Sequence, residues 1–437
     1  MSQALKRVAS RIPGWLRHKA HAFAGNTSGS AAILAALMFP VVIGGMGLGA
    51  ETGYWYFKQR ELQHAADLAA HAAGTRKRAG DSGAELREAA LEIAEKAGFS
   101  SASGTLAVNV PPVAGRYQGS ADAVEVVLTF NTPRLLSSIF SSDPVTMGAG
   151  AVTLVRGGQQ ACVLALSPSD SGAVTMAGST TVNLNGCDLA SNSLASNSVE
   201  MSGSASLSAG CVYAVGEIVE TTRLTLTECA AVKEYAPVTA DPYANVPEPQ
   251  PSDVPCDGRT RLNDETATPT FMYQSSVPAM HFCDGLRVTG TVVFEPGLYI
   301  ISGGEFWANG NAAVIQGAGV TFFLASTATA RLNGTAALNL TAPTTGPYSG
   351  LVFFGDRSGT GLEHQVNGTS GSIVQGAVYF PASHVSFSGN SRTSGGSGCT
   401  QVIGFTIELT GNSSLRSTCE LSGTRTALAN RFVRIVE

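Results

Sequence analysis

Residues 29–50, GSAAILAALMFPVVIGGMGLGA, are an unbroken apolar stretch without a charged side chain. At a rise of about 1.5 Å per residue, a helix of this length crosses the roughly 30 Å hydrocarbon core of a bilayer. Pro40 and the glycines that follow it would weaken a helix in water, but both residue types are common in membrane helices. We therefore predict a transmembrane helix at residues 29–50.

The charges on either side of this stretch predict its direction. The leader, residues 1–28, contains five basic and no acidic residues, whereas the first acid, Glu51, follows the apolar stretch directly. Positively charged flanks stay in the cytoplasm, so the rest of the chain is expected outside. A cleavable signal peptide has the same charge order, and residues 48–50 could be its cleavage site, but its apolar region usually spans only about 7–15 residues. A buried helix of a soluble protein is the third interpretation.

The composition indicates an exported β-rich protein. Only 14% of the 437 residues are charged and 50 are glycine, which favours strands and many turns over helical bundles. The net charge is −5 and the only basic cluster is the leader, so we expect no nucleic-acid partner.

All eight cysteines follow the apolar stretch, which indicates disulfides in an oxidising compartment. Buried free thiols are the alternative, and no C-x-x-C spacing suggests a metal site. Spacing along the chain favours four pairs: Cys256 with Cys283, Cys399 with Cys419, Cys187 with Cys211, and Cys162 with Cys229.

Residues 51–156 are expected to form a small α+β unit beside the membrane. Helical periodicity continues outward from the aromatic residues 54–56 as far as Gly74, and a second helix is predicted at residues 83–96, with Gly98 as its C-cap. Alternating apolar residues then predict strands at residues 106–110, 124–130 and 145–155, with a short helical piece at residues 133–140.

The stretch from Gly25 to Gly74 resembles the N-terminal region of TadG-like proteins of the Flp (tight-adherence, Tad) pilus assembly system. The matching features are Gly25-Asn26, Pro40, Glu51, Tyr54 and the run LQHAAD at residues 62–67. The resemblance implies a bacterial inner-membrane anchor with a periplasmic remainder and other Tad proteins as partners. Because Glu51 lies at the far end of the apolar stretch, we do not expect a processed pilin. The run SDSG at residues 169–172 departs from the Asp-x-Ser-x-Ser metal motif that some members carry.

From Cys162 onward a short glycine motif recurs, which predicts a right-handed parallel β-helix (β-solenoid). Gly178 and Gly203 lie 25 residues apart, and Gly310 and Gly334 lie 24 apart, which is about the length of one solenoid turn. Strands with stacked aromatic residues are predicted at residues 292–301, 320–325, 350–355 and 376–381. A β-sandwich with glycine-rich hairpins is the alternative.

The predicted division of this part has three segments. A first β-repeat portion covers residues 161–235, a proline-rich linker or excursion covers residues 236–284, and a solenoid covers residues 285–437, with a closing strand at its end.

No constellation of residues predicts catalysis, a cofactor or a metal. Acidic residues are scattered, and the densest polar group, residues 356–357 with 363–364, is interpreted as a solvated loop. We therefore expect a non-enzymatic scaffold of the Flp pilus system that acts through protein contacts, without a small-molecule ligand. The alternative is a surface or secreted β-helix protein that binds or processes polysaccharide, as an adhesin or a carbohydrate-active enzyme. Trp307 is the only tryptophan of the solenoid, which argues against a glycan-binding face.

Overall fold

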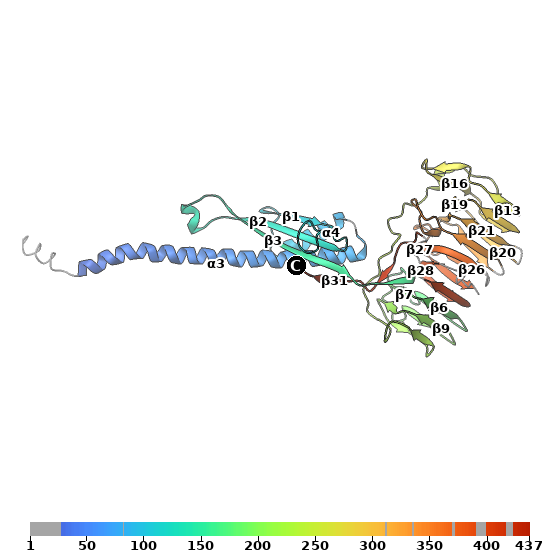
Figure 1. Cartoon of the computed structure of the whole chain (residues 1–437), viewed down its shortest axis with the longest axis horizontal. Coiled ribbons are helices and arrows are strands. Elements are labelled where there is room, and N and C mark those ends of the chain that lie inside the picture. Colours follow the sequence, from blue (N-terminus) through green and yellow to red (C-terminus); the bar gives the residue numbers. More distant parts are fainter. Residues whose placement is uncertain are drawn as a thin grey trace, which may run out of the picture.

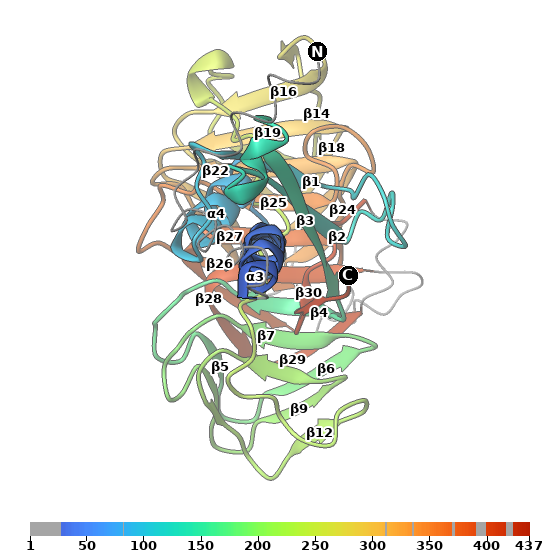
Figure 2. The ribbon, with the colours of Figure 1, turned by 90° about the vertical axis from the view of Figure 1, so that its left-hand side faces the viewer.

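The computed structural model describes residues 28–81, 83–310, 313–333, 336–368, 372–389, 399–416 and 423–437. In these residues the protein has a T-shaped outline: a long helix, a small sheet beside the second half of that helix, and a β-solenoid lying crosswise at the far end (Figure 1). Figure 2, which looks along the helix, shows the solenoid extending above and below it. The predicted fold class is confirmed, with a β-solenoid of about nine turns.

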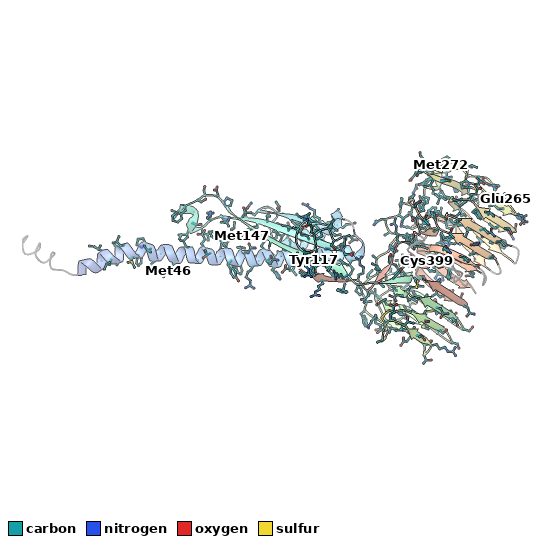
Figure 3. The ribbon with its side chains drawn as sticks, in the orientation of Figure 1. Met46, Tyr117, Met147, Glu265, Met272 and Cys399 are labelled. Atoms are coloured by element: carbon teal, nitrogen blue, oxygen red, sulfur yellow. A yellow bond between two sulfur atoms is a disulfide. The ribbon has the colours of Figure 1, made fainter. Side chains whose placement is uncertain are left out.

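The long helix, α3 (Ser28–Ala79), continues for 52 residues without a break. The large apolar side chains of its first half are exposed; Met46, labelled in Figure 3, is 71% exposed. In the part of the chain that the structure describes, α3 is the one helix long and apolar enough to cross a membrane. It fits a single-pass membrane anchor.

The predicted stop of this helix at Gly74 is wrong. The helix runs on to Ala79 and ends at Gly80, whose φ of +93° is the left-handed conformation that closes many helices. Gly74 instead allows a close approach to the sheet, because a Cβ there would lie 2.7 Å from Thr153 Oγ1 and 2.8 Å from Val433 Cγ1. Its lack of a side chain serves packing and not helix termination.

A second helix and an antiparallel sheet complete the membrane-proximal unit. The helix is α4 (Gly83–Lys96), with Gly98 just beyond it at a φ of +99°. The sheet has the order β1-β2-β3-β31, formed by β1 (Gly104–Asn109), β2 (Ala123–Thr132), β3 (Val145–Arg156) and β31 (Phe432–Ile435). The first three strands lie where the sequence predicts them. The last strand, β31, was predicted as part of the solenoid at residues 285–437, and this prediction is wrong. It belongs to the membrane-proximal unit, where it pairs with the otherwise free edge of β3.

Alanines make the contact between α3 and its neighbours close. Five buried alanines of α3 and two of α4 belong to one core cluster, which also includes the apolar face of the sheet. The seven alanines are Ala65, Ala66, Ala69, Ala70 and Ala73 of α3 and Ala90 and Ala94 of α4. Such small side chains let helix backbones approach one another. The long helix α3 is therefore built into the membrane-proximal unit over its second half.

Two adjacent segments, residues 156–159 and 429–432, form a neck between this unit and the solenoid (Figure 1). In the neck, β30 (Leu428–Ala429) pairs antiparallel with the start of β4 (Gln159–Ala165). Gly157 and Gly158 both have positive φ, and a Cβ on Gly157 would lie 2.8 Å from the Phe432 ring. The solenoid is thus an insertion between β3 and β31, attached by two chain segments.

Three parallel sheets form the solenoid. Sheet 1 contains β16 (Val277–Phe282), β19 (Gly297–Ser302), β22 (Val320–Ala325), β25 (Leu351–Gly355), parts of β27 (Ile373–Gly389) and β28 (Thr400–Thr410), then β4, β7 (Asp188–Ser191) and β10 (Val212–Ala214). Sheet 2 contains β13 (Arg261–Asn263), β17 (Leu286–Thr289), β20 (Glu305–Asn309), β23 (Thr329–Asn333), β26 (Glu363–Gly368), the second parts of β27 and β28, then β5 (Val174–Met176), β8 (Val199–Met201) and β11 (Ile218–Val219).

Sheet 3 consists of two separate groups of strands. One contains β14 (Thr266–Ala267), β18 (Thr291–Phe294), β21 (Val314–Ala318), β24 (Ala337–Thr341) and the first residues of β27. The other contains β29 (Asn412–Arg416), β6 (Thr181–Asn185), β9 (Ser206–Ala209) and β12 (Leu224–Leu226). The short strand β15 (Phe271–Tyr273) forms a hairpin with β16. The predicted strand at residues 292–301 is two strands, β18 and β19, because Pro296 lies at the corner between them.

The chain joins the stack of turns at its middle and not at an end. Its first three turns run from β4 to β12, and its later turns run from the opposite end back to the middle, where β28 pairs with β4 through Val402–Val163 and Ile403–Leu164. The predicted portions 161–235 and 285–437 are therefore halves of one solenoid. The predicted excursion 236–284 is shorter than expected, since β13 to β16 already belong to the later turns.

Residues 236–255, which we call the strap, connect the two ends of the stack along the outer face of sheet 1. Near its start, the Thr239 backbone exchanges two hydrogen bonds, of 2.8 and 2.9 Å, with the Asn192 side chain. Near its end, Val254 O lies 2.9 Å from His281 Nδ1. The strap contains a short 3₁₀ helix, η2 (Pro251–Asp253), and no strand. The proline-rich composition suits this segment because it does not pair in a sheet. Sheet 1 is consequently buried on both faces, which explains why all six residues of β22 are buried and five of them are apolar.

Aromatic residues stack along the inner face of sheet 1, as the sequence predicts. The rings of Tyr299, Phe322 and Phe353 lie on successive turns, with centroid distances of 5.5 and 5.6 Å. Each pair also adds attraction beyond its buried area. The inner core therefore runs from turn to turn without interruption.

A second aromatic ladder lies on the outer face of sheet 1 and includes the strap. Phe354 and Tyr379 are 5.4 Å apart between centroids, and Tyr243 of the strap lies 5.3 Å from Tyr379. Tyr243 is fully buried, and its hydroxyl accepts a hydrogen bond of 3.0 Å from the Arg425 backbone N–H. Tyr243 is thus the main apolar contact between the strap and the sheet.

The substitution Tyr243→Ala should destabilise the solenoid by about 3–5 kcal/mol, the usual cost of removing a buried aromatic side chain. The control is Tyr235→Ala, just before the strap, where the side chain is 71% exposed and a change within about 0.5 kcal/mol is expected. Urea unfolding of both variants, followed by circular dichroism, measures the difference. Equal midpoints for the two variants would contradict the role of the strap.

A buried histidine lies in the solenoid core. His364 is 1% exposed, its ring stacks on Phe380 at 3.9 Å, and its Nδ1 accepts a hydrogen bond of 3.2 Å from the Ala330 N–H. Burial lowers the pKa of His364 to about 3, and nearby His384 adds to the effect. His364 is therefore neutral in the folded protein at pH 7.

This histidine should make the solenoid sensitive to acid. Folding lowers the pKa of His364, so between pH 6.5 and 3 the unfolded chain binds a proton at this residue and the folded chain does not. The free energy of unfolding therefore falls as the pH decreases from about 6.5 toward 3. We expect the melting temperature to fall between pH 7 and pH 4, and His364→Gln to flatten this dependence while lowering the melting temperature at pH 7. Calorimetry across this pH range tests it; parallel profiles for the two proteins would refute the assignment to His364.

Candidate functional site

The connection between β2 and β3, residues 133–144, contacts α3 at the C-terminal end of the apolar stretch 29–50. We call this connection the hairpin tip. It contains a short 3₁₀ helix, η1 (Leu136–Ile139). The Glu51 carboxylate is 2% exposed and accepts hydrogen bonds from the backbone N–H groups of Leu135 and Ser137, both at 2.7 Å, and from the Ser137 hydroxyl at 2.8 Å. These bonds satisfy N–H groups at the start of η1 that have no partner within it. Glu51 therefore fixes the hairpin tip to the helix.

Arg134 lies beside Glu51 and contacts both the hairpin tip and α3. Its Nε donates to Asp143 O at 2.8 Å, and its guanidinium carbon lies 5.9 Å from the centre of the Trp55 ring. Trp55 is half-buried, and tryptophan is a residue type enriched at membrane–water interfaces. The hairpin tip is therefore held at its base by a carboxylate and a cation–π contact.

The run LQHAAD at residues 62–67 has a structural role on the sheet side of α3. Leu62, Ala65 and Ala66 are buried in the core of the membrane-proximal unit. The Gln63 amide donates to Gly150 O at 2.9 Å and to the Asp67 carboxylate at 2.8 Å. These residues set the position of α3 along β3. The run LQHAAD, one of the features on which the sequence resemblance rests, therefore has a structural role.

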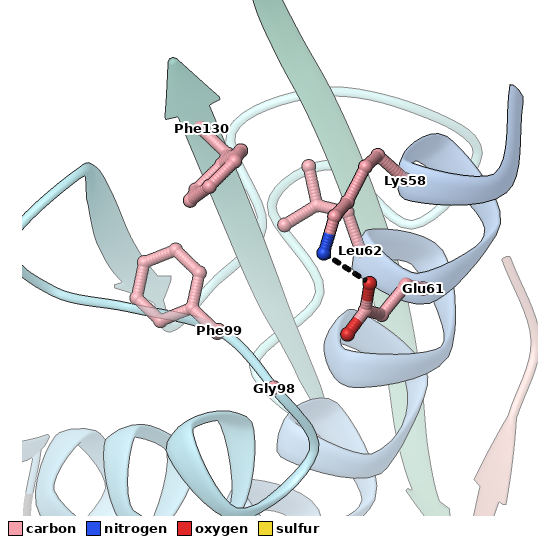
Figure 4. Close-up of a pocket in the computed structure, with 6 residues that line it drawn as sticks. All are labelled: Lys58, Glu61, Leu62, Gly98, Phe99 and Phe130. Atoms are coloured by element: carbon pink, nitrogen blue, oxygen red, sulfur yellow. Dashed lines mark hydrogen bonds and ion pairs between the residues drawn. The ribbon is translucent and has the colours of Figure 1, made fainter. Parts of the chain in front are cut away.

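A small cavity lies between α3, the segment that follows α4, and β2 (Figure 4). Lys58 and Glu61 form an ion pair of 2.8 Å at its edge, and Phe99 and Phe130 line its wall. With a volume of about 20 Å³, it accommodates a water molecule and no larger ligand. It is not a binding site.

The solenoid surface carries a larger cleft where β26, β27 and β28 turn from sheet 1 to sheet 2. Its volume is about 480 Å³, and Asp170, Glu363 and His384 contribute its titratable groups. His384 Nδ1 lies 2.8 Å from Thr406 Oγ1. The volume falls in the range of ligand sites. No sequence pattern signals this cleft, because Asp170 comes from the first turn along the chain and the other residues come from the last ones.

The polar group at residues 356–357 and 363–364 does not form the predicted solvated loop. Arg357 Nη2 donates to Tyr243 O of the strap at 2.9 Å, and its backbone N–H donates to the Glu248 carboxylate at 2.6 Å. His364 lies in the core, as described above. The Asp356 carboxylate accepts hydrogen bonds from the Ser326 and Ser358 backbone N–H groups at 2.9 and 2.7 Å. Three of these four residues therefore stabilise the fold, and only Glu363 faces the cleft.

The described disulfides are Cys162–Cys187, Cys211–Cys229 and Cys256–Cys283. The predicted pairs Cys187–Cys211 and Cys162–Cys229 are therefore wrong. Stacking places Cys187 one turn from both Cys162 and Cys211, so spacing alone could not decide between these two neighbours. Cys399 is also disulfide-bonded, but the predicted pair Cys399–Cys419 involves a residue outside the described part of the chain.

Cys256, His281 and Cys283 lie close together, as metal ligands would. Both sulfur atoms are joined in a disulfide, and Cys283 Sγ lies 3.6 and 3.5 Å from the two ring nitrogens of His281, so it sits over the ring face. The ring nitrogens have other partners: Nδ1 faces Val254 O, and Nε2 lies 2.6 Å from Ser302 Oγ. This group is built as a packed disulfide and not as a metal centre.

These features define a β-solenoid protein carried on a single long helix that can cross a membrane. Residues 29–77 match the family model described as putative Flp pilus-assembly TadE/G-like. The N-terminal region of the chain is therefore TadE/G-like, as the sequence resemblance implied. No curated protein and no solved structure matches the chain significantly.

The substitution Glu51→Ala should release the hairpin tip from α3, because two buried backbone N–H groups lose their acceptor. Hydrogen–deuterium exchange of the full chain in detergent should show faster exchange at Leu135 and Ser137. Thr52→Ala is the matched control, since the Thr52 hydroxyl bonds only to its own helix, at Leu48 O and Gly49 O. Unchanged protection at both amides in Glu51→Ala would contradict the proposed clamp.

Proposed function

We propose that the protein is a membrane-anchored scaffold of the Flp (Tad) pilus system that acts through protein–protein contacts. The observation that carries this proposal is that the TadE/G-like region and the membrane stretch lie on one unbroken helix. That helix packs on a sheet whose last two strands, β3 and β31, lead into the solenoid and return from it. Any contact made by the solenoid is therefore made at a fixed place relative to the membrane.

We infer a single-pass protein of the bacterial inner membrane, with its N-terminus in the cytoplasm and its bulk in the periplasm. The basic leader and the acid that follows the apolar stretch support this orientation. The disulfides beyond the helix support an oxidising compartment. The expected partners are other Tad/Flp assembly proteins.

We further propose that the protein is not an enzyme. The solenoid offers long lateral faces with few charged side chains, which suits protein contacts more than catalysis. One observation favours a second candidate function, the binding of polysaccharide: the 480 Å³ cleft contains Asp170, Glu363 and His384, groups that commonly hydrogen-bond sugars. In that case the chain would be a surface or secreted adhesin.

Cell fractionation with protease treatment tests the location and the partner class together. We expect full-length protein in the inner membrane, a solenoid that is degraded only after the outer membrane is opened, and cross-links to Tad/Flp assembly proteins. Replacing the five basic residues of the leader with glutamine is the matched control and should mix the two orientations. A shortened product in the medium that binds polysaccharide would instead support the adhesin function.

A further inference from the structure

The hairpin tip exposes large apolar side chains next to the membrane stretch. Leu135, Ile139 and Phe140 are 56%, 77% and 81% exposed. In Figure 1 the connection between β2 and β3 extends along α3 toward the N-terminal half of the helix, away from the solenoid. Such side chains on a protruding loop require a partner, because clustered exposed apolar residues mark interaction sites.

The position of this loop along α3 identifies the partner. Leu136 packs against Gly47, where even a Cβ would overlap its side chain. Gly47 lies within the apolar stretch 29–50, four residues and about 6 Å before Glu51 along the helix. The loop therefore reaches past the end of the membrane stretch to a level at which α3 itself exposes apolar side chains such as Met46.

We propose that the hairpin tip inserts into the outer interface of the lipid bilayer beside α3. The exposed face of α3 and the apolar side chains of the tip form one continuous surface, and the same lipid would cover both. Arg134 and Trp55, at the base of the tip, are residue types that suit the headgroup level. The protein is thus held by a spanning helix and a second, partly inserted element, which restricts tilting and rotation of the solenoid. This inference rests on the membrane anchorage proposed above.

Tryptophan fluorescence tests the insertion. The full chain carrying Phe140→Trp is reconstituted into phosphatidylcholine vesicles with or without brominated acyl chains, and the signal of the wild-type chain is subtracted. We expect the introduced indole to lose most of its fluorescence in brominated vesicles. Val113→Trp is the matched control: Val113 is 62% exposed, but it lies in the β1–β2 connection at the opposite end of the same strands, so no quenching is expected.

The outcomes separate this inference from the anchorage itself. If alkaline carbonate releases the chain from the vesicles, both the anchorage and the insertion are overturned. If the chain stays bound but Phe140→Trp is quenched no more than Val113→Trp, only the insertion is overturned. A blue-shifted but unquenched signal would then assign the surface to a contact with a second copy of the chain, since the vesicles contain no other protein. Ile139→Trp gives the same test should Phe140→Trp fail to fold.

Discussion

The close contact of α3 with β3 and β31 is the joint on which the rest of the molecule depends. Gly74 brings the helix within reach of both strands, and the Thr153 hydroxyl donates to Ala70 O at 2.9 Å. Because β3 leads into the solenoid and β31 returns from it, this one contact links the membrane helix to both ends of the inserted domain. A larger side chain at Gly74 would have to displace both strands.

The solenoid depends in turn on the strap. A turn-by-turn stack can ordinarily form from nearest neighbours along the chain. In this solenoid β28 pairs with β4 at the middle of the stack, for example through Ile403 and Leu164. The early and late halves of the solenoid can therefore pair only when the strap connects one end of the stack to the other. The apolar residues of sheet 1 point to both of its faces, and without the strap the outer aromatic ladder would be exposed. The strap therefore serves both as a connection and as the cover of a sheet.

Local patterns in the sequence were sufficient for the elements but not for their order. Hydrophobic periodicity located α4 and the strands β1 to β3, and uninterrupted apolar runs located the buried strands of sheet 1. The helix end at Gly74 was wrong because glycine also serves close packing, which a sequence does not distinguish from a helix stop. The two wrong disulfides, the insertion of the solenoid between β3 and β31, and the cleft at His384 all depend on contacts between distant segments. The role of Glu51 was likewise hidden, because its partners Leu135 and Ser137 lie more than eighty residues away.

The neck determines which surface the solenoid presents. Two glycines in sequence would suggest a free hinge, but Gly157 and Gly158 are packed against Phe432 and Leu428 and lie beside the paired strands β4 and β30. Their positive φ values and lack of space for a Cβ indicate a fixed bend, since any rotation would break that pairing. The solenoid consequently keeps its crosswise orientation to α3, and a membrane that fixes α3 also fixes the solenoid. The proposed scaffold function requires this property, because the partners of a scaffold must meet the same face at the same height above the bilayer.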